Sequence, residues 1–415
     1  MARTGNRLDE QSAHRAARRN RPREWGALYM NVLLLCEGDP ETRDSWSGIS
    51  RSVLQELRGR GHSVTPGDVE LYGLKRLIAA ATTFSPSKAR WRRRFRVGTI
   101  PFKARTINAR KRIDATGGRT DIILQVGATF DPRGYRLPYC LLCDSNIHMS
   151  QEGANTGHSE AAWLRPGELR RIAARESALY RDASAVFTLS ERARQSFVQD
   201  FAVPPTLVHA VHAGPNFDLS EIPATHRTTS SPHPPTVLFV GRDFERKGGA
   251  CLLAAFRLVR QQIPDASLLV VGPDPVERPD QGVRYLGFLD KDRLEDWRRL
   301  LEAYRTADVF CLPTRFEPYG IVFIEAMHFG LPCVGTSVWA VPEMVVEGET
   351  GFLVEVDDSA ALADRLLRIL RDPALAHRMG AAGRTRAQAR FTWAVVAKQI
   401  EEKMFAVLGM EPGIS

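Results

Sequence analysis

Short runs of Val, Ile and Leu, most of them ending at or near a glycine, alternate with amphipathic segments along this 415-residue chain. In the first half the expected strands are 31–36, 121–127, 138–144, 185–190 and 206–214. In the second half they are 236–241, 267–272, 283–288, 309–313, 332–336 and 351–356. Continuous apolar strands between helices indicate parallel sheets covered on both faces. The pattern predicts an α/β chain of two doubly wound, Rossmann-like domains, with ligands bound in the cleft between them at the carboxyl ends of the strands.

Composition shifts suggest where the domains begin and end. We expect a basic, disordered tail over residues 1–27 and an N-terminal domain over 28–220. Residues 221–235 are rich in Ser, Thr and Pro and are expected to be a linker. A C-terminal domain is expected over 236–390, and a last helix is expected over 391–415.

The formal charge of +9 is unevenly distributed. Residues 1–25 carry a net +4 and residues 86–112 a net +11, so the rest of the chain carries 9 − 15 = −6. The sequence contains no run of about 18 apolar residues, so no membrane span is predicted. The basic N-terminal segment lacks the apolar region of a secretory signal. Six cysteines are scattered through apolar strands, which is typical of a protein of the reducing cytoplasm.

Two glutamates, Glu317 and Glu325, interrupt the apolar segment "RFEPYGIVFIEAMHFG". A helix that begins near Gly320 would present free backbone N–H groups, which bind anions such as phosphate. A carboxylate beside a bound phosphate contributes to ligand binding when it accepts hydrogen bonds from hydroxyl groups of the same ligand. A phosphate between two polyols describes a nucleotide sugar. The alternative is a capping acid and a solvent-facing helix acid.

A basic loop follows the strand at 236–241, in the segment "VLFVGRDFERKGG". Arg242 can clamp phosphate oxygens through two parallel hydrogen bonds, and Lys247 adds a point charge. An ordinary basic turn would have the same composition. The basic loop and the two glutamates, in this order, together favour a nucleotide-sugar site.

These segments resemble a known family. "GRDFERKGG", "FEPYGIVFIEAM" and "VWAVPEMVVEGETGFLVEVDD" are similar to the C-terminal half of family 4 glycosyltransferases, the glycosyl transferases of group 1. The resemblance is dense over 236–360 and thin over 28–218. It implies the two-domain GT-B fold, in which the helix over 391–415 crosses back to the N-terminal domain. It also implies a retaining, metal-independent hexosyltransferase that has no cofactor and uses a nucleotide-diphosphate sugar as its donor substrate.

The resemblance also implies roles for single residues of the C-terminal half. Arg242 and Lys247 would bind the donor diphosphate, Glu317 would contact the donor sugar at the catalytic centre, and Glu325 would contact the ribose. The remaining implied donor contacts are Phe288 beside the base and the backbone of Gly320, Ile321 and Val322. Where many members carry a glycine pair ahead of the match to Pro342-Glu343, this chain has Trp339 and Ala340.

In the N-terminal half the resemblance implies fewer contacts. Gly48 matches the glycine that approaches the diphosphate ahead of a helix. Either Asp144 or His148 would contact the transferred sugar, and a turn acid and a surface histidine are the alternatives. No Asp-x-Asp follows a strand and no nucleophile pair emerges, so we expect a front-face reaction in which stabilisation of the leaving phosphate is the main catalytic effect.

Two further motifs have simple structural explanations. The cysteines of "CLLC", Cys140 and Cys143, would point to opposite faces of a strand, which argues against a metal or redox pair. Ser190 is expected to cap a helix.

The basic segment 86–112 interleaves cations with Trp91, Phe95 and Phe102. It fits an anionic membrane surface, a nucleic acid, or a solvated helical face or pocket for an acidic acceptor. The favoured function is transfer of a sugar to a hydroxyl of a cell-envelope glycan or glycolipid, in the cytoplasm or at the inner face of the cell membrane. The alternatives are a non-catalytic nucleotide-sugar-binding scaffold and another GT-B enzyme such as a nucleotide-sugar epimerase.

Overall fold

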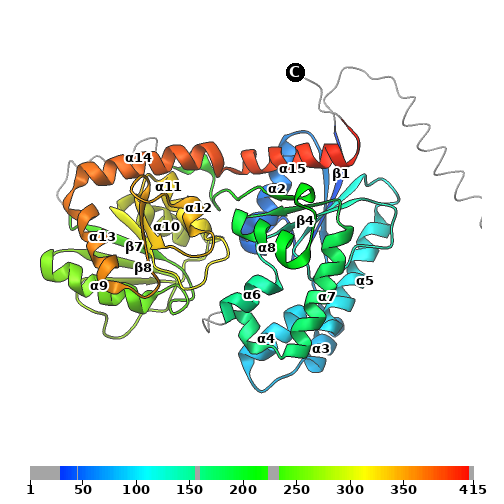
Figure 1. Cartoon of the computed structure of the whole chain (residues 1–415), viewed down its shortest axis with the longest axis horizontal. Helices are drawn as coiled ribbons and strands as arrows, with labels where there is room; N and C mark the ends of the chain where they lie inside the picture. The colour runs from blue at the N-terminus through cyan, green and yellow to red at the C-terminus, as the bar shows by residue number, and fades with distance from the viewer. Residues whose placement is uncertain (1–28, 44, 155–158, 223–232, 411–415) are drawn as a thin grey trace, which may run out of the picture.

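The protein, described here by a computed structural model, forms two domains that are each built around one six-stranded sheet (Figure 1). The structure describes residues 29–43, 45–154, 159–222 and 233–410. The tail expected at 1–27 and most of the linker expected at 221–235 lie outside the described residues.

The first sheet has the strand order β2-β1-β3-β4-β5-β6, and every neighbouring pair is parallel. Its strands are β1 (Asn31–Cys36), β2 (Ser63–Asp68), β3 (Ile122–Val126), β4 (Tyr139–Cys143), β5 (Ala185–Thr188) and β6 (Val208–Ala210). From β1 the chain moves to one side for β2 and to the other side for β3. The topological switch point, where ligands bind in open α/β sheets, therefore lies between β1 and β3.

Helices cover both faces of this sheet. They are α2 (Ile49–Gly59), α3 (Gly73–Thr82), α4 (Lys88–Val97), α5 (Thr99–Ala115), α6 (Ile147–Ala154), α7 (Pro166–Asp182) and α8 (Glu191–Phe201). Short 3-10 turns occur at η1 (Ser45–Gly48), η2 (Glu160–Trp163), η3 (Pro205–Leu207) and η4 (Leu219–Glu221). Successive strand residues alternate between two apolar clusters, so Cys140 and Cys143 face opposite sides of the sheet. This agrees with the expectation for "CLLC", and each of the six cysteines is a buried free thiol.

Strand β2 was not expected from the sequence. It contains Pro66 and Gly67, two residues that are rare in strand interiors. It lies at the edge of the sheet and pairs only with β1, so one side of its backbone needs no ladder partner. A Cβ at Gly67 would lie 2.5 Å from a methyl carbon of Leu35, so a larger residue there would have to displace this buried side chain.

The second sheet has the order β12-β11-β10-β7-β8-β9 and is also parallel throughout. Its strands are β7 (Thr236–Val240), β8 (Ser267–Val271), β9 (Val283–Gly287), β10 (Val309–Leu312), β11 (Cys333–Thr336) and β12 (Gly351–Val354). Its helices are α9 (Gly249–Gln262), α10 (Leu294–Thr306), α11 (Ile321–His328), α12 (Val341–Met344), α13 (Ser359–Arg371) and α14 (Pro373–Arg390). The switch point of this sheet lies between β7 and β10. The prediction of two doubly wound α/β domains is confirmed.

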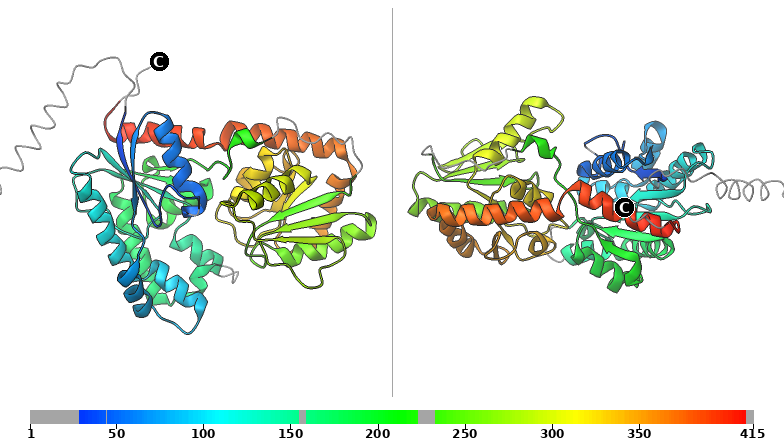
Figure 2. Two further views of the ribbon diagram at one scale, coloured as in Figure 1. Left: turned by 180° about the vertical axis from the view of Figure 1, so that it is seen from behind. Right: turned by 90° about the horizontal axis from the view of Figure 1, so that it is seen from above.

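The last helix, α15 (Trp393–Val407), lies on the N-terminal domain, although α14 before it belongs to the C-terminal domain (Figure 2). It packs on α2, and the buried carboxylate of Glu401 accepts hydrogen bonds from Arg60 Nε at 2.8 Å and pairs with His62 Nε2 at 2.7 Å. The other crossing occurs near Phe217, whose ring contacts Trp297 and Phe329 of the C-terminal domain. Two segments of the chain therefore join the domains.

The basic segment 86–112 forms α4, α5 and the turn between them. Not all of its cations are on the surface, because Arg105 is 1% exposed and lies 3.0 Å from Glu37 and 3.5 Å from Glu70. The aromatic side chains also face inward. The Trp91 indole donates to Ala80 O at 2.9 Å, and the ring of Phe102 packs under the guanidinium of Arg175. Within the described ranges, no helix is long and apolar enough to cross a membrane.

Candidate functional site

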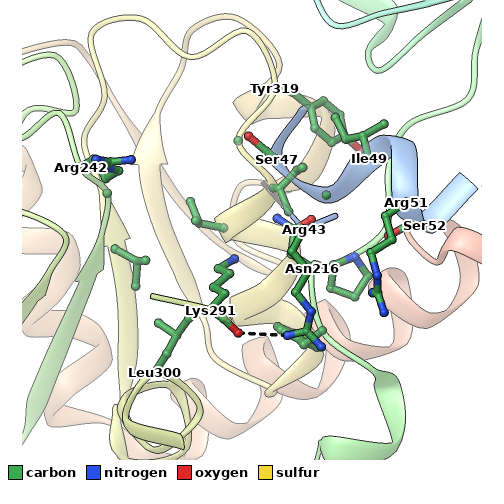
Figure 3. A pocket seen from close by; sticks show the side chains of 18 of the residues that line it. Arg43, Ser47, Ile49, Arg51, Ser52, Asn216, Arg242, Lys291, Leu300 and Tyr319 are labelled. Carbon is green, nitrogen blue, oxygen red and sulfur yellow. Dashed lines mark hydrogen bonds between the residues drawn. The ribbon is translucent and has the colours of Figure 1, made fainter. Parts of the chain in front are cut away.

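A cleft of about 1010 Å³ opens between the two domains, at the carboxyl ends of strands of both sheets (Figure 3). It is lined by the loops after β1, β4, β6, β7, β9 and β10 and by the start of α15. A hydrogen bond crosses it, from Arg43 Nη1 to Lys291 O at 3.3 Å. Of the predicted site residues, those that line the cleft are Gly48, Asp144, Arg242, Lys247, Phe288, Glu317, Gly320, Ile321 and Val322.

The loop after β7 is held in place by two glycines. Gly248 has a φ of +76° and precedes α9, and a Cβ there would lie 1.8 Å from Pro313 O in the loop after β10. A Cβ on Gly241 would lie 2.3 Å from the Cδ of Lys247. The two loops can approach this closely only because glycine occupies position 248, and Gly241 leaves room for the side chain of Lys247, which lines the cleft.

The loop after β10 places Glu317 against that ammonium. Glu317 Oε2 lies 2.5 Å from Lys247 Nζ and 3.8 Å from a guanidinium nitrogen of Arg246. Gly320 follows with a φ of +96° and precedes the first residue of α11. The free N–H groups of the first turn of α11 therefore lie beside Glu317, as the sequence predicted. The carboxylate is therefore paired with cations that are suited to bind a phosphate.

Glu325, one turn into α11, lies behind the cleft wall and is 1% exposed. Its carboxylate accepts from Tyr304 Oη at 2.8 Å and from the backbone N–H of Asn216 at 3.3 Å, and it lies 3.2 Å from Lys291 Nζ. Burial and the neighbouring Glu325 carboxylate hold the pKa of Tyr304 well above its usual value, so the phenol remains a donor. A ligand hydroxyl would reach Glu325 by taking the position of Lys291 or Asn216, both of which line the cleft.

Arg242 and Phe288 form the opposite rim of the cleft. The guanidinium carbon of Arg242 lies 4.3 Å from the centre of the Phe288 ring, and this ring is 50% exposed. A half-exposed aromatic ring covered by a cation offers a flat surface to a planar ligand group. Figure 3 shows Arg242 on the strand side of the cleft, apart from the residues of the N-terminal domain.

The N-terminal domain contributes the loop between β1 and α2. Gly48 has a φ of +82° and precedes α2, and a Cβ there would lie 3.0 Å from Asn216 Oδ1. The two residues before it, Trp46 and Ser47, also have positive φ values of 51° and 54°. Non-glycine residues in this conformation cost of order 1 kcal/mol each and cluster at functional sites. The strained turn directs the N-terminus of α2 at the cleft.

The structure separates the two candidates that follow β4. Asp144 lines the cleft and accepts a hydrogen bond from Ser145 Oγ at 3.1 Å. His148 is not among the lining residues, and its imidazole packs edge-to-face on Phe201 with ring centres 4.8 Å apart. Of the pair, only Asp144 is brought to the site.

Two residues that line the cleft, Asn216 and Lys291, were not predicted from the sequence as site residues. The Oδ1 of Asn216 is buried and has no hydrogen-bond partner among the described residues. Asn216 follows β6 in "HAGPN" and Lys291 follows β9 in "YLGFLDK". Their position just beyond the carboxyl ends of strands is the signal that could have identified them.

Trp339 departs from the glycine that many members of the resembled family carry, yet it keeps a backbone conformation that favours glycine. Its φ is +55°, in the left-handed region. The indole packs edge-to-face on Phe316, with ring centres 4.7 Å apart, and Phe316 directly precedes Glu317. This chain therefore places an aromatic side chain, on a turn with left-handed backbone, next to the candidate sugar-binding acid.

Glu343 of the C-terminal domain caps a helix of the other domain. Its two oxygens accept from the backbone N–H groups of Glu191 and Arg192 at 2.7 and 2.8 Å, at the start of α8. Burial raises the pKa of Glu343, and the two N–H bonds oppose that rise. Ser190 completes the cap, as predicted, by accepting from Ala193 N–H at 3.0 Å. The contact fixes one domain against the other beside the cleft.

A second cavity of about 440 Å³ adjoins the cleft on the side of the N-terminal domain. The two cavities share Asp144 and Glu317 in their walls. Burial raises the pKa of Glu176, which lines the second cavity, to about 7. Among the described residues, no group of three or more His, Cys, Asp or Glu side chains is arranged to hold a metal ion.

Comparison with known proteins supports the resemblance. Residues 234–372 match the family model described as Glycosyl transferases group 1. Over 174 residues, 40% of this chain, the sequence is 41% identical to a phosphatidyl-myo-inositol mannosyltransferase of Mycobacterium leprae. That match covers 45% of the mycobacterial protein, so the chain spans about half the length of this curated relative.

Solved structures match over nearly the whole chain. Sucrose-phosphate synthase of Thermosynechococcus elongatus aligns with a TM-score of 0.67 and 21% identity, over 91% of this chain and 99% of that one. HepE of Anabaena, solved with UDP and glucose, aligns with a TM-score of 0.61 and 19% identity, over 90% and 99%. Together with the sheet order, these similarities confirm the predicted GT-B fold. Over residues 234–372 the chain thus carries a Glycosyl transferases group 1 domain, which confirms the family resemblance of its C-terminal half.

Proposed function

We propose that this protein is a retaining, metal-independent glycosyltransferase that moves a hexose from a nucleotide-diphosphate sugar to a hydroxyl of a cell-envelope glycan or glycolipid. The observation that carries this proposal is the ion pair between Lys247 and Glu317 beside the N-terminus of α11. It places a cation, a carboxylate and free backbone N–H groups at one switch point, which is the chemistry a sugar diphosphate requires. The complex of HepE with UDP and glucose supports a nucleotide-sugar donor.

In this proposal each group has one task. Arg242, Lys247 and the helix N-termini at Gly48 and Gly320 stabilise the negative charge of the departing diphosphate. Glu317 holds hydroxyls of the transferred sugar, since a carboxylate can accept from two donors. The acceptor oxygen attacks the anomeric carbon from the face that the leaving group occupies, and its proton passes to the departing phosphate. No protein nucleophile is required, so the anomeric configuration is retained.

The donor is identified first by thermal unfolding in the presence of UDP, GDP, ADP and their common sugar conjugates. A ligand held at 100 times its dissociation constant adds about 2.7 kcal/mol to the stability of the state that binds it. Stabilisation by one nucleotide and its conjugates identifies the base. The absence of stabilisation by every nucleotide contradicts the proposal. Release of that nucleotide from its sugar conjugate, dependent on an acceptor fraction, then tests transfer.

We further propose that the acceptor is reached at the inner face of the cell membrane, through a surface formed by α3, α4 and α5. Helix α3 exposes Leu74, Leu77 and Ile78 on one face, and Leu74 and Leu77 are 72% and 68% exposed. Exposed cations accompany them, among them Lys75, Lys88, Arg92 and Lys103. Apolar side chains beside cations are complementary to anionic lipid. Figure 1 places α3 and α4 at the end of the domain remote from α15. The mycobacterial relative, by its name, glycosylates a phospholipid.

Flotation with vesicles of phosphatidylglycerol tests this surface. The double variant Leu74→Ser/Leu77→Ser is expected to lose most vesicle binding, and Leu294→Ser, at an exposed leucine of α10 in the other domain, is the matched control. Wild-type binding is expected to fall with added salt because the attraction is electrostatic. Equal binding of all three proteins would exclude α3 as the contact surface.

A further inference from the structure

A buried arginine connects the loops that follow two neighbouring strands. Arg105, on α5, is 1% exposed, and its guanidinium lies 3.0 Å from Glu37 Oε1 and 3.5 Å from Glu70 Oε1. Glu37 directly follows β1 and Glu70 lies just beyond β2, and these two strands are paired. Arg105 Nη1 also donates to Arg96 O, near the end of α4, at 2.8 Å. A rigid, planar guanidinium with partners in three segments fixes these segments relative to one another.

The contact between Arg105 and Glu37 depends on their charges. It is an ion pair without hydrogen-bond geometry, since Arg105 Nε and Glu37 Oε1 are buried and neither has a hydrogen-bond partner among the described residues. Neither residue lines the cleft or the second cavity. Apolar residues of similar volume often replace a buried ion pair without loss of stability. The pair is therefore explained better by the position it imposes on the loops than by the stability it adds.

From Glu37 the connection continues to the turn before α2. The carbonyl oxygen of Glu37 accepts from Ser45 Oγ at 3.1 Å, and Ser45 is 6% exposed. The next three residues, 46–48, have positive φ values of 51°, 54° and 82°. A backbone of this kind, with two non-glycine residues in the left-handed region, persists only where surrounding contacts hold it. The bond from Ser45 to Glu37 is one of these contacts.

The other contacts hold Trp46, the first residue of the turn. A Cβ on Gly127, directly after β3, would lie 2.3 Å from a carbon of the Trp46 ring, so the indole packs on the backbone there. The guanidinium carbon of Arg96 lies 5.7 Å from the centre of the same ring. Arg105 therefore contacts two of the residues that support the turn, Glu37 on one side and Arg96 on the other.

We propose that Arg105 is a positioning residue of the donor site, which holds the turn 46–48 so that the N-terminus of α2 faces the donor diphosphate. The proposal rests on the proposed function, in which this helix N-terminus stabilises the departing diphosphate. Arg105 acts through Glu37 and Arg96 and does not touch the ligand. Without it the turn relaxes toward negative φ values, and the free N–H groups of α2 turn away from the cleft.

Hydrogen exchange measures the hold on the turn without any ligand. Glu37→Gln is expected to speed exchange in peptides that cover residues 45–57 and to leave the rest of the protein unchanged. Glu70→Gln is the matched control, since Glu70 pairs with the same guanidinium but its loop does not line the cleft. A merely structural role of Arg105 would make the two variants alike. Glu37→Gln keeps Arg105 in place and so remains informative if Arg105→Gln folds poorly.

Titration calorimetry measures the consequence for the donor site. The probe is whichever of UDP, GDP and ADP stabilises the wild type. Glu37→Gln and Arg105→Gln are expected to bind it about tenfold or more weakly, and Glu70→Gln within about twofold of the wild type. Equal affinities of wild type and Glu37→Gln, or equal exchange of both over 45–57, overturn the proposal. If exchange changes as expected but the wild type binds none of the three nucleotides, the proposed function fails and the hold of Arg105 on the turn is supported.

Discussion

Lys247 Nζ lies 2.5 Å from Glu317 Oε2, so the cation expected to bind the donor phosphate is paired with the acid expected to bind the donor sugar. The two groups come from loops after adjacent strands, β7 and β10, on either side of the switch point. Binding of a sugar diphosphate requires each of them to exchange this contact for one with the ligand.

Glu317→Gln is expected to abolish sugar transfer and to leave the fold intact. The amide keeps the shape of the side chain but can no longer accept from two sugar hydroxyls as an anion does. The turnover number is expected to fall by roughly 100-fold or more, in line with the loss of a group used in the transition state. Nucleotide binding is expected to persist, because Lys247 is freed from its partner.

The control for this variant is Glu302→Gln on α10. Glu302 is paired with Arg305 on the surface, an exposed i,i+3 pair of little energetic weight. Full turnover of Glu317→Gln, compared with Glu302→Gln in the same assay, would show that the donor-site assignment is wrong.

Glu325→Gln is expected to weaken binding of the nucleotide even when no sugar is attached. The variant removes the negative charge that orients Lys291 and that would accept from ribose hydroxyls. A charged hydrogen bond is worth about 1.5–3 kcal/mol, so the dissociation constant is expected to rise about tenfold or more. Titration calorimetry with the free nucleotide measures it, and an unchanged constant would leave Glu325 with a structural role only.

Gly248→Ala is expected to destabilise the protein and to impair donor binding. Gly248 and Gly348 have nearly the same φ, +76° and +75°, but a Cβ meets Pro313 O at 1.8 Å at the first position and nothing within 4 Å at the second. Gly348→Ala therefore measures the backbone strain alone, about 1 kcal/mol. The additional loss in Gly248→Ala measures the contact between the loops. Equal denaturation midpoints for the two variants would contradict this account.

Acid is expected to weaken the attachment of α15. Burial tends to raise the pKa of Glu401, but the bonds from Arg60 and His62 outweigh it and hold the pKa below its usual value. Because the folded-state pKa is lowered, the stabilisation is present above the unfolded value of about 4.3 and is lost as pH falls through the folded value. Glu401→Gln is expected to cost about 1–3 kcal/mol at pH 7.

Urea denaturation at pH 7 and at pH 3 measures this effect. The difference in denaturation midpoint between wild type and Glu401→Gln is expected to shrink at pH 3. At that pH the Glu401 carboxyl is largely protonated in the unfolded chain and increasingly protonated in the folded protein, so it resembles the uncharged amide of the variant. A difference that is independent of pH would show that the charge of Glu401 contributes nothing.

The sequence predicted the parallel sheets because buried parallel strands read as continuous apolar runs, which need no knowledge of their neighbours. It did not predict β2, whose Pro66 and Gly67 are tolerated only because the strand lies at a sheet edge. Edge position is a property of the assembled sheet, so no local pattern records it.

The donor half of the site was predicted for a similar reason. The donor-site residues follow closely in sequence the strands that position them: Arg242 and Lys247 follow β7, and Glu317 follows β10. Asn216 enters the cleft from the loop that follows the last strand of the other domain, and its role depends on contacts with residues far away in the chain. The sequence left open whether the segment 86–112 is a membrane surface, a nucleic-acid site, or a solvated helical face or pocket. Trp91 and Phe102 face inward because the helices that carry them, α4 and α5, pack against α3 and α7.

The indole of Trp393 donates to Pro215 O at 2.7 Å, so the two segments that join the domains are bonded to each other where they cross. A body joined to another at one point can turn about any axis through it. Here the two crossings lie together at one corner, and a Cβ on Gly214 would lie 2.6 Å from Trp393 N. A rotation of one domain about that corner would therefore change the gap between the Asp144 and Glu317 sides of the cleft more than the contacts at Trp393. Such a rotation would first have to break the bonds of Glu343 to the start of α8.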